Sequence, residues 1–364
     1  LDDCKVIPNC IARSFRDKRF YIGSQLDHEC KDYGELQIRR PVEKGYIVNW
    51  ESEKCIWDYT FFNNDAELKC DPRDTNLVLT EAPNCPQALQ ASCDQMIFEG
   101  FEFASYYRCQ APTLNAYNDI PNLLGDPPLL TSIGQLPVEC LMLIDSGYSN
   151  TTVTPLLYGK PLQQATRRLD IGGKFMTNYL KEQFSTRQVD MSDETYVVDE
   201  IKKNICFVSD SFRRDLERTW KGGPKDVDLS IMLDYVLPDY EIRHFPEMRP
   251  HDPTQTVRTR KLAAGPGPKE MVLSVGKERF NVPELLFSPS DVGMKEAGLP
   301  DVVMQSLEAL PQSLWPAMLG NIVTVGGNTQ IPGFLKRLES EIRQRAPSDY
   351  VVRLACPSDP IKYT

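Results

Sequence analysis

The sequence has no long hydrophobic run: no apolar stretch approaches the roughly 18 residues that a membrane-spanning helix needs. Its first residues, 1–5, lack the basic and apolar regions of a secretory signal. There are only 3 histidines, without metal-ligand spacing, and the 11 cysteines include no C-x-x-C pair. These absences argue against a membrane span, a zinc site and a disulfide framework. Such scattered cysteines are typical of reduced thiols in the cytosol or nucleus.

The chain also has fewer basic than acidic residues, 41 Lys and Arg against 51 Asp and Glu. The formal net charge is −10, which argues against nucleic-acid binding over the whole surface but leaves room for a local basic face. The length of 364 residues suffices for two medium domains or one large one. The chain begins without methionine and stops at residue 364 without a closing element, so we expect both ends to be missing.

The most informative feature is an apolar stretch, residues 141–144, that runs into Asp145, Ser146 and Gly147, with a second predicted strand at 151–157. This pattern predicts a hairpin that holds a carboxylate and several backbone N–H groups at one point. A nucleotide phosphate and its metal ion need these two things together. An ordinary hairpin turn is the alternative.

A second corner has the same form. The apolar residues 323–325 end at Gly326, Gly327 and Asn328, and a predicted helix begins near Pro332. Two strand-to-glycine corners far apart in the sequence suggest two similar halves that face one ligand.

Strands and helices alternate along the chain, which indicates an α/β class. We predict a buried strand at 77–83, a short strand at 105–110, a loop at 118–137, a strand that runs up to Phe280 and a turn at 282–293. Helices are predicted at 87–98, 174–184, 195–208, 300–310 and 332–345. Trp50, Trp57 and Phe61 recur at helical spacing, which indicates core packing.

Residues 241–270 interrupt this pattern. They contain five prolines and six basic residues against four acidic ones, so the segment is locally positive. A solvated loop is one interpretation. The other is a docking segment for a partner or DNA, with Arg258, Arg260 and Lys261 as its charged core.

Several motifs, in this order and spacing, resemble the actin family over nearly the whole chain. They are Arg40-Pro41-Val42-Glu43-Lys44-Gly45, residues 77–83, Ile144-Asp145-Ser146-Gly147, Leu169-Asp170-Ile171-Gly172-Gly173, residues 278–280 and 283–287, Val325-Gly326-Gly327-Asn328 and Ile331-Pro332-Gly333. The resemblance implies an α/β, actin-like fold of the actin/ATPase-chaperone (ribonuclease H-like) type, with two lobes and a central nucleotide cleft.

The same resemblance implies a division of the chain. Residues 1–150 form a first lobe, with a small outer subdomain inserted at about 8–40 and the first phosphate loop missing. Residues 151–330 form a second lobe that carries the proline-rich basic insertion 241–270, and residues 331–364 return toward the first lobe.

The resemblance also implies a site for ATP or ADP with Mg²⁺. Asp145 matches the residue that holds the metal through water, Ser146 and Gly147 match phosphate donors, and Gln110 matches the residue that orients the attacking water. The remaining matches surround the sugar and base: Gly173, Lys202, Lys203, Gly326, Gly327, Asn328 and Lys362.

Four departures from actin weaken the expected chemistry. Tyr148 stands where actin has a second aspartate, Ser149 replaces a glycine, Thr152 replaces a histidine, and Lys203 occupies a glutamate position. We therefore expect nucleotide to be held structurally and turned over slowly or not at all, with Gln110 and Asp145 as catalytic remnants.

Residues 8–21 are also shorter than the family's filament-contact loop, so we expect no homopolymer.

Stretches such as Met191-Ser192-Asp193-Glu194-Thr195 are most similar to the nuclear actin-related members of the family. They imply a non-catalytic scaffold of an ATP-dependent chromatin remodeller that exchanges a variant histone into nucleosomes. The implied partners are a Snf2-type motor, a small zinc-finger subunit, a RuvB-like ATPase ring and the nearby nucleosome. The implied location is the nucleus, with the cytoplasm as a second one. The alternative is an active actin-like ATPase with a cytoskeletal or filament role.

Overall fold

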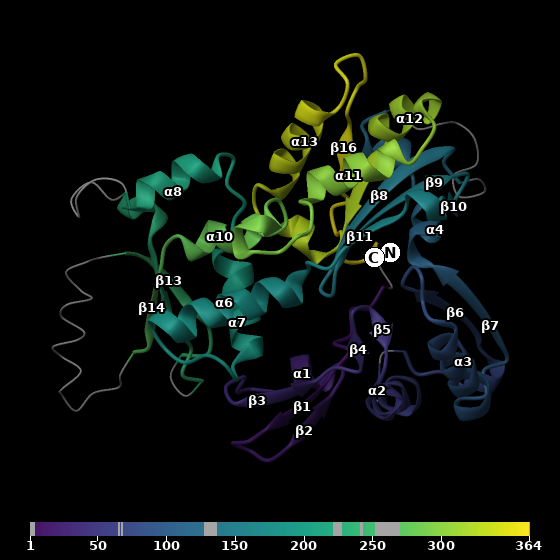
Figure 1. Cartoon of the computed structure of the whole chain (residues 1–364). Helices are drawn as coiled ribbons and strands as arrows, with labels where there is room; N and C mark the ends of the chain where they lie inside the picture. Colours follow the sequence, from purple (N-terminus) through teal and green to yellow (C-terminus); the bar gives the residue numbers. More distant parts are fainter. Residues whose placement is uncertain are drawn as a thin grey trace, which may run out of the picture.

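The computed structural model describes residues 4–64, 66, 68–126, 137–220, 228–240, 243–251 and 270–363. Figure 1 shows a mixed sheet and its helices in the upper part of the molecule, with smaller sheets and helices below. Strands and helices alternate along the chain, as the α/β prediction requires. In the described part of the chain, no helix is both long and apolar enough to cross a membrane.

The largest sheet has the order β10-β9-β8-β15-β16, with β11 also paired to β9. Its strands are β8 (Cys140–Ser146), β9 (Thr151–Leu157), β10 (Lys160–Pro161), β11 (Arg167–Leu169), β15 (Ile322–Val325) and β16 (Leu354–Ala355). β8 and β9 form the predicted hairpin, and β8 runs parallel to β15. The expected lobe boundary at residue 150 falls inside this hairpin. Both β8 and β15 are almost wholly buried, as expected for central strands with covered faces.

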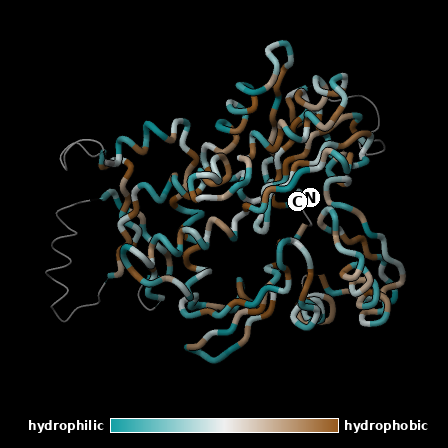
Figure 2. The backbone as a smooth tube through the Cα atoms, viewed as in Figure 1, coloured by the Kyte–Doolittle hydropathy of each residue, from teal (hydrophilic) through white to brown (hydrophobic). Residues whose placement is uncertain are grey.

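Helices α11 (Leu299–Glu308) and α12 (Trp315–Gly320) contact this sheet, and α13 (Phe334–Arg345) packs on α11 (Figure 1). The neighbouring helices are α6 (Gly173–Arg187), α7 (Thr195–Ile205), α8 (Phe212–Trp220) and α10 (Glu278–Glu284), with α10 in contact with α6 and α8. Short 3-10 turns lie between these elements at η3 (Gln163–Ala165), η4 (Leu229–Ile231), η5 (Pro289–Val292), η6 (Gln312–Leu314) and η7 (Gly327–Gln330). One large hydrophobic core includes Ile144 of β8, Phe184 of α6 and Phe334 of α13. Figure 2 shows hydrophobic residues along the strands and helices of this part.

A second sheet corrects two sequence predictions. It has the order β13-β12-β14, with β12 (Leu233–Val236), β13 (Glu247–Pro250) and β14 (Val272–Val275). Part of the expected loop 241–270 is therefore a strand, because β12 supplies backbone partners for it. Arg258, Arg260 and Lys261 lie outside the described residues. The strand predicted to reach Phe280 ends at Val275; Phe280 is instead fully buried in α10, which also occupies the start of the predicted turn 282–293.

The lower part begins with an outer sheet of order β2-β1-β3. Its elements are β1 (Ile11–Ser14), β2 (Phe20–Ile22), α1 (Gln25–His28) and β3 (Leu36–Arg39), followed by the hairpin β4 (Val42–Glu43) and β5 (Tyr46–Ile47). Helix α2 (Trp50–Phe62) starts at Asn49, whose side chain accepts a hydrogen bond from the Ser52 backbone. Trp57 and Phe61 pack against Phe101 at centroid distances of 5.4 and 6.1 Å, which confirms their predicted core role.

Two parallel strands complete the lower part: β6 (Asn76–Glu81) and β7 (Ser105–Gln110). Next to them lie η1 (Pro72–Asp74), α3 (Gln87–Gln95) and a π-helical turn η2 (Met96–Gly100). Helix α4 (Ala111–Asn115) contacts both β7 and the large sheet, and Ile120 of α5 (Ile120–Leu123) is buried with residues of β8 and β15. The strand predicted at 77–83 exists but is not buried, since Val78 is 58% exposed. The helix predicted to Phe98 changes to the π turn at Met96, and α5 lies within the expected loop 118–137.

The start of α11 gives a test of packing. A methyl group on Gly298 would overlap the carbonyl of Phe287, whereas one on Gly320 would meet nothing within 4 Å. We expect Gly298→Ala to lower the free energy of unfolding by about 1–3 kcal/mol or more, because backbone atoms must move. Gly320→Ala should change it by less than about 0.5 kcal/mol. Chemical denaturation of both variants measures the difference; equal stabilities would contradict this packing.

Candidate functional site

The two glycine corners lie side by side on one sheet. β8 and β15 are parallel neighbours, and Asp145 pairs with Val325, so their carboxyl ends meet at the same edge. Gly326 has φ +95°, and a methyl group there would overlap the Ser146 carbonyl and lie 2.9 Å from Asp145 Oδ1. Only glycine permits this approach. The prediction that two separate halves present the corners is therefore wrong, because both come from the same sheet.

Buried side chains tie the two corners together. The Thr151 hydroxyl donates to the Ile171 carbonyl at 2.9 Å. Because that proton is used, the Ser146 hydroxyl is the donor in its 2.9 Å bond to Thr151. The Asn328 amide donates to Ser146 Oγ at 3.2 Å and to the Gly147 carbonyl at 2.7 Å. Ser146 and Asn328 thus hold the turn itself.

The next predicted donors also have partners inside the chain. The Gly147 N–H donates to the Asn150 carbonyl at 3.0 Å, and the Gly173 N–H donates to the Gly147 carbonyl at 3.0 Å. The Lys202 ammonium is buried and donates to the Gly173 carbonyl, the Thr177 hydroxyl and Asp199 at 3.1, 2.8 and 2.7 Å. An ammonium has three N–H donors, so none remains for a ligand.

Other lysines predicted at the base also form ion pairs. Lys203 lies 3.2 Å from Asp199 and 2.7 Å from Glu200, and Lys362 lies 3.7 Å from Asp359. Burial works to raise the pKa of Asp199, but its two lysine neighbours outweigh burial and lower this pKa to about 2. The binding roles of Lys202, Lys203 and Lys362 remain predictions, and the structure gives these lysines roles in holding α7 and the chain end.

The two predicted phosphate donors, the Ser146 hydroxyl and the Gly147 N–H, are engaged within the chain. The Gly173 N–H and Lys202, which were predicted near the sugar and base, are engaged as well. Asp145 differs, since no described residue donates a hydrogen bond to its carboxylate. Burial alone raises its pKa to about 6. A desolvated carboxylate without a cationic neighbour fits a hydrated divalent ion.

Tyr148, in the same turn, is held by Arg40, which follows β3 in the lower part of the molecule. The Arg40 guanidinium lies over its ring, 4.6 Å from the centroid, and the ring packs against Gly173 on α6. Its hydroxyl is buried without a hydrogen-bond partner among the described residues. Burial raises the pKa of this hydroxyl, and the positive charge of Arg40 opposes that effect. Thr152, opposite Asp145 on β9, is buried as well.

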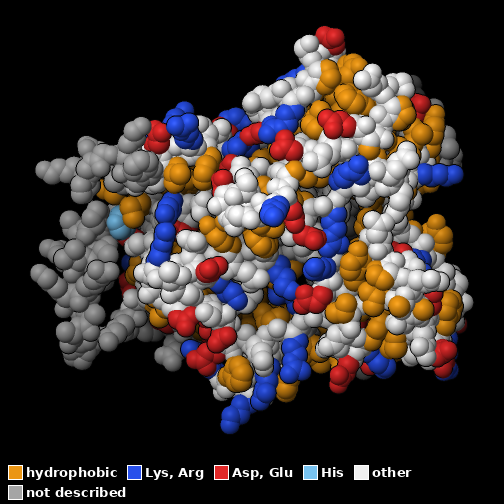
Figure 3. Space-filling view, viewed as in Figure 1, with side chains coloured by type: hydrophobic (Ala, Val, Ile, Leu, Met, Phe, Trp, Pro, Cys, Tyr) orange, Lys and Arg blue, Asp and Glu red, His pale blue; other side chains and the backbone are white. Residues whose placement is uncertain are grey.

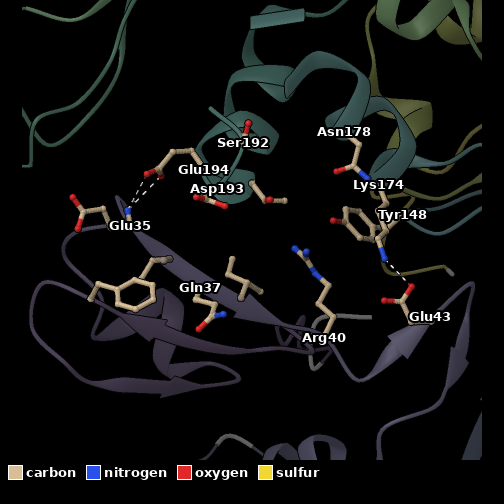
Figure 4. Close-up of a pocket in the computed structure, with 14 residues that line it drawn as sticks. Glu35, Gln37, Arg40, Glu43, Tyr148, Lys174, Asn178, Ser192, Asp193 and Glu194 are labelled. Carbon is tan, nitrogen blue, oxygen red and sulfur yellow. Dashed lines mark hydrogen bonds and ion pairs between the residues drawn. The ribbon is translucent and has the colours of Figure 1, made fainter. Parts of the chain in front are cut away.

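A pocket of about 650 Å³ lies between β3 and the starts of α6 and α7 (Figure 4). Tyr148 lines it, but Asp145, Gln110 and the glycine corner at 326–328 do not. Two polar contacts cross the pocket: Lys174 Nζ lies 2.7 Å from Glu43 Oε2, and the Glu194 carboxylate accepts from the Glu35 N–H at 3.2 and 3.3 Å.

Aromatic rings also join the segment before β3 to α7. Tyr33 stacks on Tyr196 of α7, with centroids 4.7 Å apart and planes 7° apart, and Tyr240 lies 6.0 Å from Tyr33. We call these contacts, with Arg40–Tyr148, Lys174–Glu43 and Glu35–Glu194, the cleft contacts. The sequence analysis missed all of them as site residues, because the partners lie far apart in the chain. Only the unusual Tyr148 signalled a change in the cleft.

A two-lobed mixed α/β structure with adjoining glycine corners and a pocket between the lobes defines an actin-type fold. Residues 3–363 match the family model described as Actin. The chain is 50% identical over 378 residues to "Actin-like protein arp6" of Aspergillus fumigatus, covering 100% of this chain and 81% of that protein. It is 51% identical over 363 residues to "Actin-related protein 6" of Neurospora crassa, covering 98% and 80%. It is 35% identical over 369 residues to "Actin-related protein 6" of Drosophila melanogaster, covering 100% and 86%. The chain belongs to the actin family.

Neighbouring glycines test the paired corners. Gly326→Ala forces a strained φ and an overlap with Ser146, whereas a methyl group on Gly327 would meet nothing within 4 Å. We expect Gly326→Ala to cost about 1–3 kcal/mol of unfolding free energy and Gly327→Ala to be nearly neutral. Thermal or urea unfolding compares them. Indifference to both substitutions would show that the corners do not pack together as described.

Asp145 gives a pH-dependent test. Its pKa rises from 3.8 to about 6 on folding, so the folded state holds the proton more tightly. Its contribution to stability is complete below about pH 3.8 and lost as the pH rises through about 6. We expect Asp145→Asn to stabilise the protein at pH 8 by on the order of 1–3 kcal/mol, with a smaller gain at pH 5.

Mg²⁺ supplies the matching control for Asp145. An ion held through water favours the carboxylate, so added Mg²⁺ should narrow the stability gap between Asp145→Asn and the natural protein at pH 8. Calorimetry at both pH values, with and without Mg²⁺, makes the comparison. A variant that is less stable at both pH values would contradict the raised pKa.

Proposed function

We propose that the chain is a non-catalytic actin-related subunit of an ATP-dependent chromatin-remodelling complex that exchanges a variant histone into nucleosomes. The observation that carries the proposal is the position of Tyr148: it lies in the phosphate turn, and its ring stacks beneath Arg40, which follows β3 in the lower part of the molecule. A turn engaged in joining the lobes is suited to a scaffold rather than to phosphate chemistry.

The contacts around the turn support the absence of turnover. The predicted phosphate donors Ser146 and Gly147 are bonded within the chain, and a neutral threonine faces Asp145 where actin has histidine. Loss of a polarising acid or base costs about 10² to 10⁴ in rate. ATP or ADP with Mg²⁺ enters the proposal only as a structural ligand. Gln110 ends β7 and has no catalytic role in it.

The partners follow from the kind of actin-related protein that the chain resembles. They are a Snf2-type motor, a small zinc-finger subunit and a RuvB-like ATPase ring, with the nucleosome nearby and the nucleus as the location. The support is the likeness over the whole chain to fungal and animal proteins named actin-related protein 6. Arg258, Arg260 and Lys261 remain proposed contacts to a partner or DNA.

The rival function is an active actin-like ATPase with a filament role. A filament needs a long contact loop on the outer sheet, but only five residues, 15–19, connect β1 and β2. This short hairpin favours a protein that does not form a homopolymer.

We expect the full-length protein to hydrolyse ATP at the background rate, unchanged by Asp145→Ala. Tyr148→Ala should weaken co-purification with the remodeller subunits without raising turnover, because it removes the ring beneath Arg40. Phe245→Ala removes an 81% exposed ring and serves as the control. The assays are steady-state phosphate release and quantitative mass spectrometry of the tagged protein's complex. Turnover like that of polymerised actin, abolished by Asp145→Ala, would favour the filament ATPase.

A further inference from the structure

The outer sheet leaves one of its faces uncovered. Arg13 lies opposite both Phe20 and Gln37 in the strand register, and Ile11 lies opposite Arg39. Directly paired residues share a face, and alternate residues of one strand share it too. We call the following residues the outer face: Ile11, Arg13, Phe15, Phe20, Gln37 and Arg39. The opposite face carries Ala12, Tyr21 and Leu36, which are buried in a small hydrophobic core.

The outer face and its hairpin turn are basic. Arg13, Lys18, Arg19 and Arg39 are exposed, and none forms an ion pair within 4.0 Å with another described residue. Nearby acids are engaged elsewhere. Asp17 accepts from the Tyr21 hydroxyl at 2.5 Å, and Asp32 pairs with Arg16 at 2.6 Å. Four unpaired cations in a chain of net charge −10 form a local field that attracts an acidic partner.

The same surface also carries exposed aromatic rings. Phe15 and Phe20 are 53% and 61% exposed. The Arg13 guanidinium lies over both rings, 5.5 and 5.6 Å from their centroids, so one face of each is already in contact with a cation. Figure 3 shows blue basic side chains with orange hydrophobic ones along the lower edge of the molecule, where Figure 1 places this sheet. A partner that covers these exposed rings removes apolar surface from water, which stabilises the complex.

We propose that the outer face is a docking surface for an acidic protein segment in which aspartate or glutamate alternates with large apolar side chains. The carboxylates pair with Arg13, Arg19 and Arg39, and the apolar side chains cover Phe20 and Phe15. The proposal rests on the scaffold function, since it names the chemistry of a partner that such a subunit would hold.

Nucleic acid fits this surface less well. The phosphate backbone of a duplex offers charge but no apolar side chains to cover two phenylalanines. A single strand binds by stacking its bases on aromatic rings, and here Arg13 already occupies one face of each ring. An acidic and apolar peptide satisfies both the cations and the rings.

The test measures binding to the full-length protein by fluorescence anisotropy. The probe is a labelled peptide of alternating glutamate and leucine, compared with a peptide of equal charge that has serine for leucine. Duplex and single-stranded DNA of equal charge are the other probes. We expect the glutamate–leucine peptide to bind at least about tenfold more tightly than each of the others. Tighter binding of either DNA, equal binding of the two peptides, or no peptide binding would overturn the proposal.

Variants locate the site. Arg13→Glu with Arg39→Glu, and separately Phe20→Ser, should each weaken peptide binding about tenfold, while Arg13→Lys with Arg39→Lys keeps most of it. Phe15 is left intact because it also lines the pocket between the lobes.

The control variant is Arg213→Glu with Lys336→Glu, which changes the net charge by the same amount. These two side chains are 93% and 75% exposed, and their reversal should leave peptide affinity within about twofold. If the Arg13→Glu/Arg39→Glu and Arg213→Glu/Lys336→Glu proteins lose the same affinity for the peptide, the loss is due to net charge alone. That result would overturn the assignment of the site to the outer face. Co-purification of the remodeller subunits is scored separately, so failure of peptide binding leaves the scaffold function testable by itself.

Discussion

The close approach of Gly326 to the Ser146 carbonyl is the constraint on which the site depends. It requires φ +95° and the absence of a side chain, and it aligns the ends of β8 and β15. Once these ends meet, Asn328 reaches Ser146 and Gly147, and the turn packs on the first residues of α6. The arrangement leaves Asp145 at the sheet edge as a carboxylate without a described donor. It also directs the donors of the turn inward.

The cleft contacts provide what a bound ligand provides in a nucleotide-dependent clamp. A partly buried cation–π pair contributes about 0.5–2 kcal/mol, and a stacked tyrosine pair about 0.5–1.5 kcal/mol beyond its buried area. The Lys174–Glu43 pair is 39% and 55% exposed, and an exposed pair of this kind adds little. A ligand at a hundredfold excess over its dissociation constant contributes about 2.7 kcal/mol. Protein contacts of comparable size therefore suffice to join the lobes.

Much of the fold could be predicted from local pattern. The β8–β9 hairpin and β7 follow from apolar runs bounded by turn residues, and the Asp145 corner was found because it interrupts one of them. The errors have physical causes. β13 has no hydrophobic alternation and exists because β12 pairs with it. Phe280 belongs to a helix because the surrounding core buries it there, although a short apolar run suits a strand equally well.

The site was predictable in position but not in chemistry. The resemblance to the actin family implied that Ser146, Gly147 and Lys202 belong to one locality, and they do lie around the same turn and helix start. Spacing could not show that their donors satisfy one another, because that depends on Thr151, Asn328 and Asp199 in three dimensions. Tyr33 and Tyr196 stack on each other although 163 positions separate them in the chain, and no local pattern reveals such a pair.

The central proposal is that the cleft contacts suffice to hold the two lobes together, whether or not a structural nucleotide is bound. Small-angle X-ray scattering of the full-length protein, with and without ATP and Mg²⁺, tests it most directly, with Tyr33→Ala combined with Arg40→Ala as the opened reference. The account predicts one compact radius of gyration that ATP leaves unchanged, and a larger radius for the double variant. A natural protein that is open without nucleotide and contracts when ATP and Mg²⁺ are added would contradict it.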